Sequence, residues 1–241
     1  MVKAPVQGNE SASANQVKSY FDQLAGRWSA HYAPGGRMRE RIERFVSACE
    51  QDSHPDMRIL DFGCGSGELA RALAEKGWRA TGCDISGEML RNAQAAPGSD
   101  QVKWQAIETS GAFELPFEDE SFDVAVASSV FEYIAEPATP LGELYRILAP
   151  HGRILLTVPD MRHAVRISEE NRRHSLRGRM ARWVRRVKVG GEDTDYLKYS
   201  VARIAPGEWL ELLRACGFAP GPIENCEDPL LLVAGRKIDK L

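Results

Sequence analysis

Short apolar segments alternate with segments of helical periodicity through the middle of the chain, and this alternation restricts the fold more than any other feature. The apolar segments occupy residues 57–62, 79–84, 102–107, 122–128 and 152–158, and the helical patterns residues 68–76, 87–95 and 140–148. Strands that are apolar along their whole length, with helices between them, are typical of a parallel sheet covered on both faces. The pattern predicts a doubly wound α/β domain that binds its ligand beyond the carboxyl ends of the strands.

The flanking segments predict additions to this domain. Residues 1–13 are small and polar, which predicts a disordered tail, and residues 14–50 carry two helical patterns that predict an N-terminal helical cap. The central domain is expected to comprise residues 55–159 and 204–241, with a last helix at 206–216 and a last strand near 228–237. Residues 160–203 interrupt it without a strand signal, so we expect an inserted helical lid.

Composition excludes several classes of protein. The 241 residues contain 31 Lys+Arg and 34 Asp+Glu, so the net charge is -3. No segment approaches 18 apolar residues and the first residues lack a hydrophobic signal region, so we expect a cytoplasmic protein. The 5 cysteines show no CxxC spacing and no nearby histidine pair, so we expect neither disulfides nor a metal site. Nothing in the sequence indicates an oligomeric state.

A glycine-rich loop follows the first apolar segment. Gly63, Gly65 and Gly67 alternate directly after a strand and before a helix, where absent Cβ atoms allow a ligand to approach the backbone. A dinucleotide-binding loop needs a third glycine at position 68, where this chain has Glu68. Together with Asp61 ahead of the loop, this carboxylate favours a cationic ligand over a phosphate. The alternative interpretation is a simple turn.

Asp84 ends the next strand, 21 positions after Gly63. An acid at this place can accept hydrogen bonds from both hydroxyls of an unphosphorylated ribose. The alternative is that Asp84 only caps the helix starting near Ser86. The loop and the acid together predict an adenosine site without phosphates.

These segments resemble the class I S-adenosylmethionine-dependent methyltransferases. The resemblance covers residues 57–159 and 205–235, and its motifs are RILDFGCGSGELA, TGCDISGEML, LPFEDESFDVAVASSVFEYI and LYRILAPHGRILLTVPD. The last two look most like the ubiquinone and menaquinone biosynthesis branch and its small-molecule relatives. The resemblance implies a Rossmann-like, seven-stranded, mostly parallel sheet with S-adenosylmethionine as the cofactor.

The same resemblance implies roles for individual residues. Asp61 would lie near the cofactor ammonium, Asp84 would bind the ribose, and Ser128 would lie beside the methionine carboxylate or the methyl group. The loop residues Gly63, Cys64, Gly65 and Gly67 would contact the methionine part, Ile85, Ile107 and Glu108 would surround the adenine, and Tyr20, Trp28 and Arg37 would reach the cofactor or substrate from the N-terminal helices. The family's usual Glu-His pair after the fourth strand is Glu132-Tyr133 here, so the resemblance provides no histidine base.

Methyl transfer from a sulfonium can proceed by positioning and exclusion of water, so a base is needed only for an alkyl hydroxyl or a weakly acidic phenol. The candidate bases are Tyr133, His163 and His174, with Glu132 a further one; the alternative for each histidine is an exposed helix position. The sequence after the fourth strand lacks the Asn/Asp-Pro-Pro-aromatic signature, which disfavours methylation of DNA bases.

We therefore expect a methyltransferase that acts on a small or lipophilic acceptor, with oxygen as the expected methylated atom and nitrogen or carbon as the alternatives. The different-class alternatives are a nucleotide-dependent oxidoreductase of the NAD type and a non-catalytic subunit that only binds S-adenosylmethionine. The absence of the third glycine at position 68 argues against the oxidoreductase.

Residues 174–188 predict a basic amphipathic helix. Residues 160–190 hold nine Arg and one Lys against three acids, a charge of +7. The apolar face comprises Leu176, Met180, Trp183, Val184 and Val187, and the arginines occupy the other faces. Three interpretations stay open: a lid over the acceptor pocket, a helix on a membrane surface, or a site for an anionic carrier or RNA.

Overall fold

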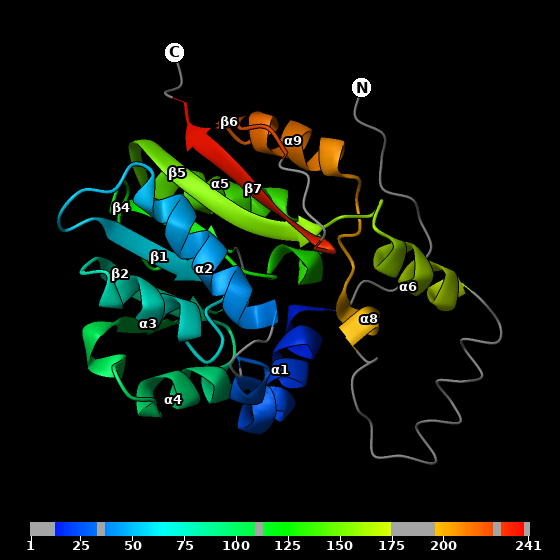
Figure 1. The fold of residues 1–241 in the computed structure, drawn as a ribbon, viewed down its shortest axis with the longest axis horizontal. Helices are drawn as coiled ribbons and strands as arrows, with labels where there is room; N and C mark the ends of the chain where they lie inside the picture. The colour runs from blue at the N-terminus through cyan, green and yellow to red at the C-terminus, as the bar shows by residue number, and fades with distance from the viewer. Residues whose placement is uncertain (1–12, 33–36, 109–112, 175–195, 224–227, 239–241) are drawn as a thin grey trace.

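A seven-stranded sheet forms the centre of the protein in the computed structural model, which describes residues 13–32, 37–108, 113–174, 196–223 and 228–238 (Figure 1). The strand order is β3-β2-β1-β4-β5-β7-β6. The strands are β1 (Arg58–Phe62), β2 (Arg79–Asp84), β3 (Lys103–Ala106), β4 (Phe122–Ala127), β5 (Leu148–Pro159), β6 (Phe218–Pro220) and β7 (Leu230–Lys237). The first five pair in parallel, and β7 runs antiparallel to both β5 and β6. The predicted doubly wound fold is confirmed.

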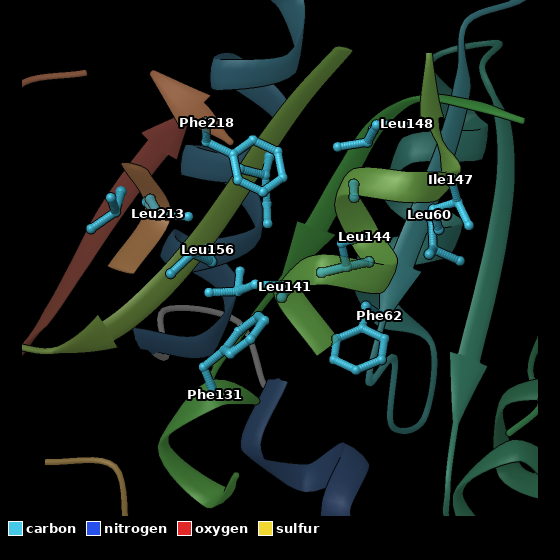
Figure 2. Packing of buried hydrophobic residues seen from close by; sticks show 14 of the residues in the cluster. Leu60, Phe62, Phe131, Leu141, Leu144, Ile147, Leu148, Leu156, Leu213 and Phe218 are labelled. Carbon is cyan, nitrogen blue, oxygen red and sulfur yellow. The ribbon is translucent and has the colours of Figure 1, made fainter. Parts of the chain in front are cut away.

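Helices cover both faces of the sheet. The helices that follow or precede the central strands are α2 (Arg37–Glu50), α3 (Glu68–Glu75), α4 (Gly87–Ala95), α5 (Ala138–Ile147) and α9 (Pro206–Ala215). Phe45 of α2 and Leu73 of α3 pack with Ile59 and Val124 in a cluster on one face. The other cluster joins α5 and α9 to the sheet, and Figure 2 shows Leu141 and Leu144 of α5 among its side chains.

Most of the remaining elements lie near the carboxyl ends of the strands. They are α1 (Ala14–Trp28), the 3-10 turns Ser29–Tyr32 and Phe131–Tyr133, and the helices α6 (Ala164–His174) and α8 (Tyr196–Tyr199). A further 3-10 turn, Ser99–Gln101, directly precedes β3 at the opposite edge of the sheet. Ser13 caps α1 in a capping box with Gln16. Asp22 of α1 accepts a hydrogen bond from the Ser86 hydroxyl at 2.6 Å, which attaches α1 to the start of α4.

Several expectations concern residues that the structure does not describe. Nearly all of the predicted tail (1–13) and of the predicted basic helix (174–188) lies outside the described residues. Among the helices that are described, none is both long and apolar enough to cross a membrane. Within the same ranges, no group of three or more His, Cys, Asp or Glu side chains could hold a metal ion.

Candidate functional site

A cavity of about 780 Å³ opens beyond the carboxyl ends of β1, β2 and β4. Its wall takes residues from the loops after these three strands, from α1 and α2, and from α6 and α8. This is the edge at which doubly wound sheets bind their ligands. The volume falls within the range of small-molecule sites, about 300–1,000 Å³.

The glycine loop forms the floor of this cavity. Gly63, Gly65 and Gly67 have φ values of +71°, +54° and +80°, which favour glycine. A Cβ on Gly63 would lie 2.4 Å from a methyl carbon of Val130, so the loop packs tightly against the segment after β4. Gly63, Cys64 and Gly65 line the cavity, as expected. Gly67 does not, because it packs on Trp104, whose ring would lie 2.3 Å from an added Cβ.

Asp61 is a buried carboxylate in the cavity wall. It is 1% exposed, and its Oδ2 atom has no hydrogen-bond donor among the described residues. Burial, with the nearby charge of Asp84, raises the pKa of Asp61 to about 8, although the backbone N–H of Ala70 opposes this shift. An unpartnered acidic oxygen facing a cavity is a suitable partner for a cationic ligand group.

Asp84 lies in the same wall and is anchored by the backbone. Its two oxygens accept hydrogen bonds from the N–H groups of Gly65 and Ser86, each at 2.8 Å. Burial raises the pKa of Asp84, and these two backbone bonds oppose the shift. The cap of α4 is Ser86, whose hydroxyl accepts from the Met89 N–H at 3.1 Å. These bonds therefore fix the orientation of the Asp84 carboxylate in the cavity wall, and each oxygen keeps a further lone pair that can accept a hydrogen bond from a ligand hydroxyl.

Arg41 is a cavity residue that sequence reasoning missed. Its Nη1 donates to Ser129 Oγ at 2.8 Å, while its buried Nε has no acceptor among the described residues. Burial lowers the pKa of Arg41. The arginine expected at this place from the sequence was Arg37, one helical turn earlier; its side chain is not among those that the structure describes. Arg41, Phe45 and Cys49 follow one another at intervals of four residues and therefore share one face of α2. Because Phe45 and Cys49 are buried, this spacing could have indicated that Arg41 also points into the protein.

The other residues expected at the cofactor divide into two groups. Ile85, Ile107 and Ser128 line the cavity. Glu108 is exposed and does not line it. Tyr20 does not line it either, because its ring stacks on Tyr199 of α8 with centroids 4.6 Å apart.

The N-terminal helix still contributes aromatic side chains to the wall. Trp28, which was expected there, and Phe21, which was not, both line the cavity. The Phe21 ring meets the ring of Tyr133 edge-on at 5.1 Å and that of Trp28 at 5.6 Å. These contacts form an aromatic wall on the side of the cavity that faces α1.

The expected catalytic residues occupy different places. Tyr133 lines the cavity, and burial together with the adjacent Glu132 carboxylate raises the pKa of its phenol well above the ordinary value. His163 does not line the cavity; its Nδ1 accepts the N–H of Val165 at 3.2 Å, at the start of α6. His174 is the last residue of α6, and its side chain is not among those that the structure describes.

A buried polar network connects the cavity to α6 and α8. Glu132 Oε2 accepts from the Ser200 hydroxyl at 3.0 Å and lies 3.7 Å from Arg166 Nη1. Glu169 of α6 accepts from Arg166, Arg203 and the Tyr196 hydroxyl at 3.1, 2.9 and 2.5 Å. These bonds hold α6 and α8 against the segment after β4.

Comparison with known proteins identifies a domain in the central part of the chain. Residues 60–156 match a family model described as a methyltransferase domain. The chain is 28% identical over 217 residues to a demethylmenaquinone methyltransferase of Clavibacter sepedonicus, covering 87% of this chain and 84% of that one. Residues 60–156 therefore form a methyltransferase domain of the class I S-adenosylmethionine-dependent type. The cofactor of this methyltransferase domain is S-adenosylmethionine.

Other relatives match over shorter parts of their length. A malonyl-[acyl-carrier protein] O-methyltransferase of Serratia marcescens is 30% identical over 149 residues, which is 62% of this chain and 54% of that protein. The chain spans between 41% and 60% of the first four curated relatives that it matches. Magnesium protoporphyrin IX methyltransferase of Synechocystis has the same fold, with a TM-score of 0.65 at 16% identity, covering 94% of this chain and 100% of that one.

Proposed function

We propose that this methyltransferase transfers a methyl group from S-adenosylmethionine to an oxygen atom of a small or lipophilic acceptor. The observation that carries the proposal is that one cavity wall contains two ionisable groups that each have a buried atom without a partner among the described residues, the Asp61 carboxyl group and the Arg41 guanidinium. The methionine part of the cofactor is a zwitterion. Its ammonium suits Asp61 and its carboxylate suits Arg41.

The rest of the wall supports the remaining contacts. Asp84 would accept the ribose hydroxyls, Ile85 and Ile107 would enclose the adenine, and Gly63 and Gly65 would allow the cofactor onto the backbone. Ser128 would lie beside the methionine end. The proposal assigns no ligand contact to Gly67, Glu108 or Tyr20, which lie outside the wall.

An apolar acceptor fits beside the aromatic side chains of the cavity wall. Phe21 and Tyr133 supply aromatic surface next to Trp28, which lies over Gly65 of the glycine loop, and Val165 of α6 also lines the cavity. The names of the relatives, demethylmenaquinone methyltransferase and malonyl-[acyl-carrier protein] O-methyltransferase, support a small or lipophilic acceptor. We assign residues 14–50 and 160–203 as the cap and lid that exclude water from the reaction.

Calorimetry and isotope transfer test the proposal. S-Adenosylhomocysteine should bind, and NADH should not, because its pyrophosphate would face Asp61, Glu68 and Asp84. Arg41→Ala should weaken the binding of S-adenosylhomocysteine by about 10- to 100-fold, the loss expected for a charged hydrogen bond. Methyl-labelled cofactor incubated with extract of the producing organism should label a small molecule. Tight NADH binding without a response to S-adenosylhomocysteine would refute the proposal, and binding without label transfer would indicate a non-catalytic subunit.

A further inference from the structure

Glu132 is a buried carboxylate of the cavity wall with one anchored oxygen and one free oxygen. Its side chain is 4% exposed. Oε2 is held by the Ser200 hydroxyl at 3.0 Å and lies near Arg166, whereas Oε1 receives no hydrogen bond from any described residue. A carboxylate oxygen without a donor, in the wall of a ligand cavity, can accept a hydrogen bond from a ligand hydroxyl.

The segment that carries Glu132 packs against the glycine loop. Glu132 follows Val130 by two residues, and Val130 packs directly on Gly63 of the glycine loop. Ser129, in the same segment, accepts the hydrogen bond from Arg41. The segment after β4 therefore borders both the proposed methionine site and the apolar part of the cavity.

The charged groups around Glu132 come from four segments. Arg166 and Glu169 lie on α6, Arg41 on α2, Tyr196 on α8, and Ser200 and Arg203 in the segment after α8, with Tyr133 adjacent in sequence. Burial raises the pKa of Glu132, and the charges of Arg166, Arg203 and Arg41 and the Ser200 hydroxyl oppose the shift. A carboxylate with a raised pKa is a stronger proton acceptor than a surface glutamate.

The other polar groups near this part of the cavity are less suited to accept a proton. The raised pKa keeps the Tyr133 phenol protonated at neutral pH. Glu169 already accepts hydrogen bonds from Arg166, Arg203 and Tyr196. No residue in the described part of the cavity wall is a histidine.

We propose that Glu132 is the general base of the methyl transfer and that the acceptor is a hydroxyl compound, an alcohol or a phenol. This inference rests on the proposed function. The acceptor O–H donates to Glu132 Oε1, and the acceptor oxygen bonds to the methyl carbon as the carbon–sulfur bond breaks. The electron pair of that bond stays on sulfur, which yields neutral S-adenosylhomocysteine, and the acceptor proton passes to Glu132 and then to water. Ser200 and Arg166 are positioning residues that hold the other carboxylate oxygen.

The test compares Glu132→Gln with Glu136→Gln, a matched control because Glu136 also borders the cavity but is exposed. Both variants should bind S-adenosylhomocysteine within about three-fold of the wild type in calorimetry, a change of under 1 kcal/mol. Methyl transfer to catechol, 1-naphthol and the hydroxyl fraction of the extract should fall by about 10²–10⁴-fold in Glu132→Gln alone, the contribution typical of a general base. At saturating S-adenosylmethionine, which keeps Asp61 ionised, the wild-type kcat/KM for the acceptor should decline at acid pH as Glu132 is protonated, and Glu132→Gln should lack this decline. Glu132→Asp, which retains a shorter carboxylate, should keep part of the activity.

The chemical stability of the labelled product gives a readout that does not depend on the acceptor's identity. An ether survives mild alkali, whereas a methyl ester releases labelled methanol. An alkali-labile product, or transfer to octanoate that Glu132→Gln leaves intact, would overturn the inference because a carboxylate needs no base. Equal loss of S-adenosylhomocysteine binding and of activity in Glu132→Gln would show a structural role and would also overturn it. These outcomes leave the proposed methyl transfer standing, whereas a wild-type protein that binds S-adenosylhomocysteine but labels nothing contradicts both proposals.

Discussion

The affinity for S-adenosylhomocysteine should depend on pH because cofactor binding requires Asp61 to be ionised. The pKa of Asp61 is about 8 in the ligand-free protein, so its carboxyl group is mostly protonated at neutral pH. An ammonium group pairs with the carboxylate and not with the neutral acid. Below pH 8, each unit of pH therefore lowers the ionised fraction about ten-fold, which corresponds to about 1.4 kcal/mol of binding free energy.

The magnitude follows directly from the pKa. At pH 6 about one Asp61 in a hundred is ionised, and at pH 7 about one in ten, so the dissociation constant should fall about ten-fold between these values. The cofactor ammonium stays charged across this range. Calorimetry in two buffers of different ionisation enthalpy should also detect close to one proton released for each S-adenosylhomocysteine bound at pH 6.

Asp61→Asn is the control for this prediction. The variant should bind S-adenosylhomocysteine more weakly and without the pH dependence, because the titrating group is gone. A wild-type dissociation constant that is the same at pH 6 and pH 7 would refute the reasoning. So would a pH dependence that persists unchanged in Asp61→Asn, since another group would then be responsible.

Thermal unfolding of the ligand-free protein gives an independent check. The pKa of Asp61 is higher in the folded than in the unfolded protein, so the folded state binds more protons and this group lowers stability as the pH rises from about 4 to 8. Asp61→Asn removes that cost. The melting temperature of the variant should therefore exceed that of the wild type by a margin that grows between pH 5 and pH 8.

Three further predictions concern the cofactor contacts, the loop and the lid. Asp84→Ala should weaken S-adenosylhomocysteine binding by about 10- to 100-fold with the fold retained, and unchanged affinity in calorimetry would limit Asp84 to its backbone contacts. Gly63→Ala should lower the free energy of unfolding in urea by about 1–3 kcal/mol, because φ is +71° and the new Cβ would lie 2.4 Å from a neighbouring methyl carbon. Gly142→Ala, which meets no atom within 4 Å in a helix, should raise it by about 0.5–1 kcal/mol, and equal effects of the two changes would contradict the packing argument. If the predicted basic helix lies on membranes, Arg182→Glu with Arg186→Glu should reduce binding to anionic vesicles by about 1 kcal/mol or more for each residue, with S-adenosylhomocysteine affinity unchanged. If neither the wild type nor the double variant sediments with the vesicles, the predicted helix does not bind membranes, and its expected role is only that of a lid.

Sequence alone predicted the features that depend on local patterns. Alternating apolar and helical segments indicate a parallel sheet, because only a sheet covered on both faces buries strands of that kind. The glycine loop follows β1 and Asp84 ends β2, so their convergence at one sheet edge follows from the parallel topology. The short strand β6 at Phe218–Pro220 was not located, since three residues carry no periodicity.

Tertiary structure alone decided which side chains of the helices enter the cavity. Arg37 and Arg41 are one helical turn apart on α2, and the burial of Phe45 against the sheet determines that Arg41 reaches the cavity beside Ser129. Tyr20 and Phe21 are adjacent on α1, yet Phe21 lines the cavity and Tyr20 stacks on α8. The anchored oxygen of Glu132 is held by Ser200 and lies near Arg166 of α6, both far away in the sequence. A helical pattern defines which residues share a face, whereas the direction of that face is set by packing against elements that are distant along the chain.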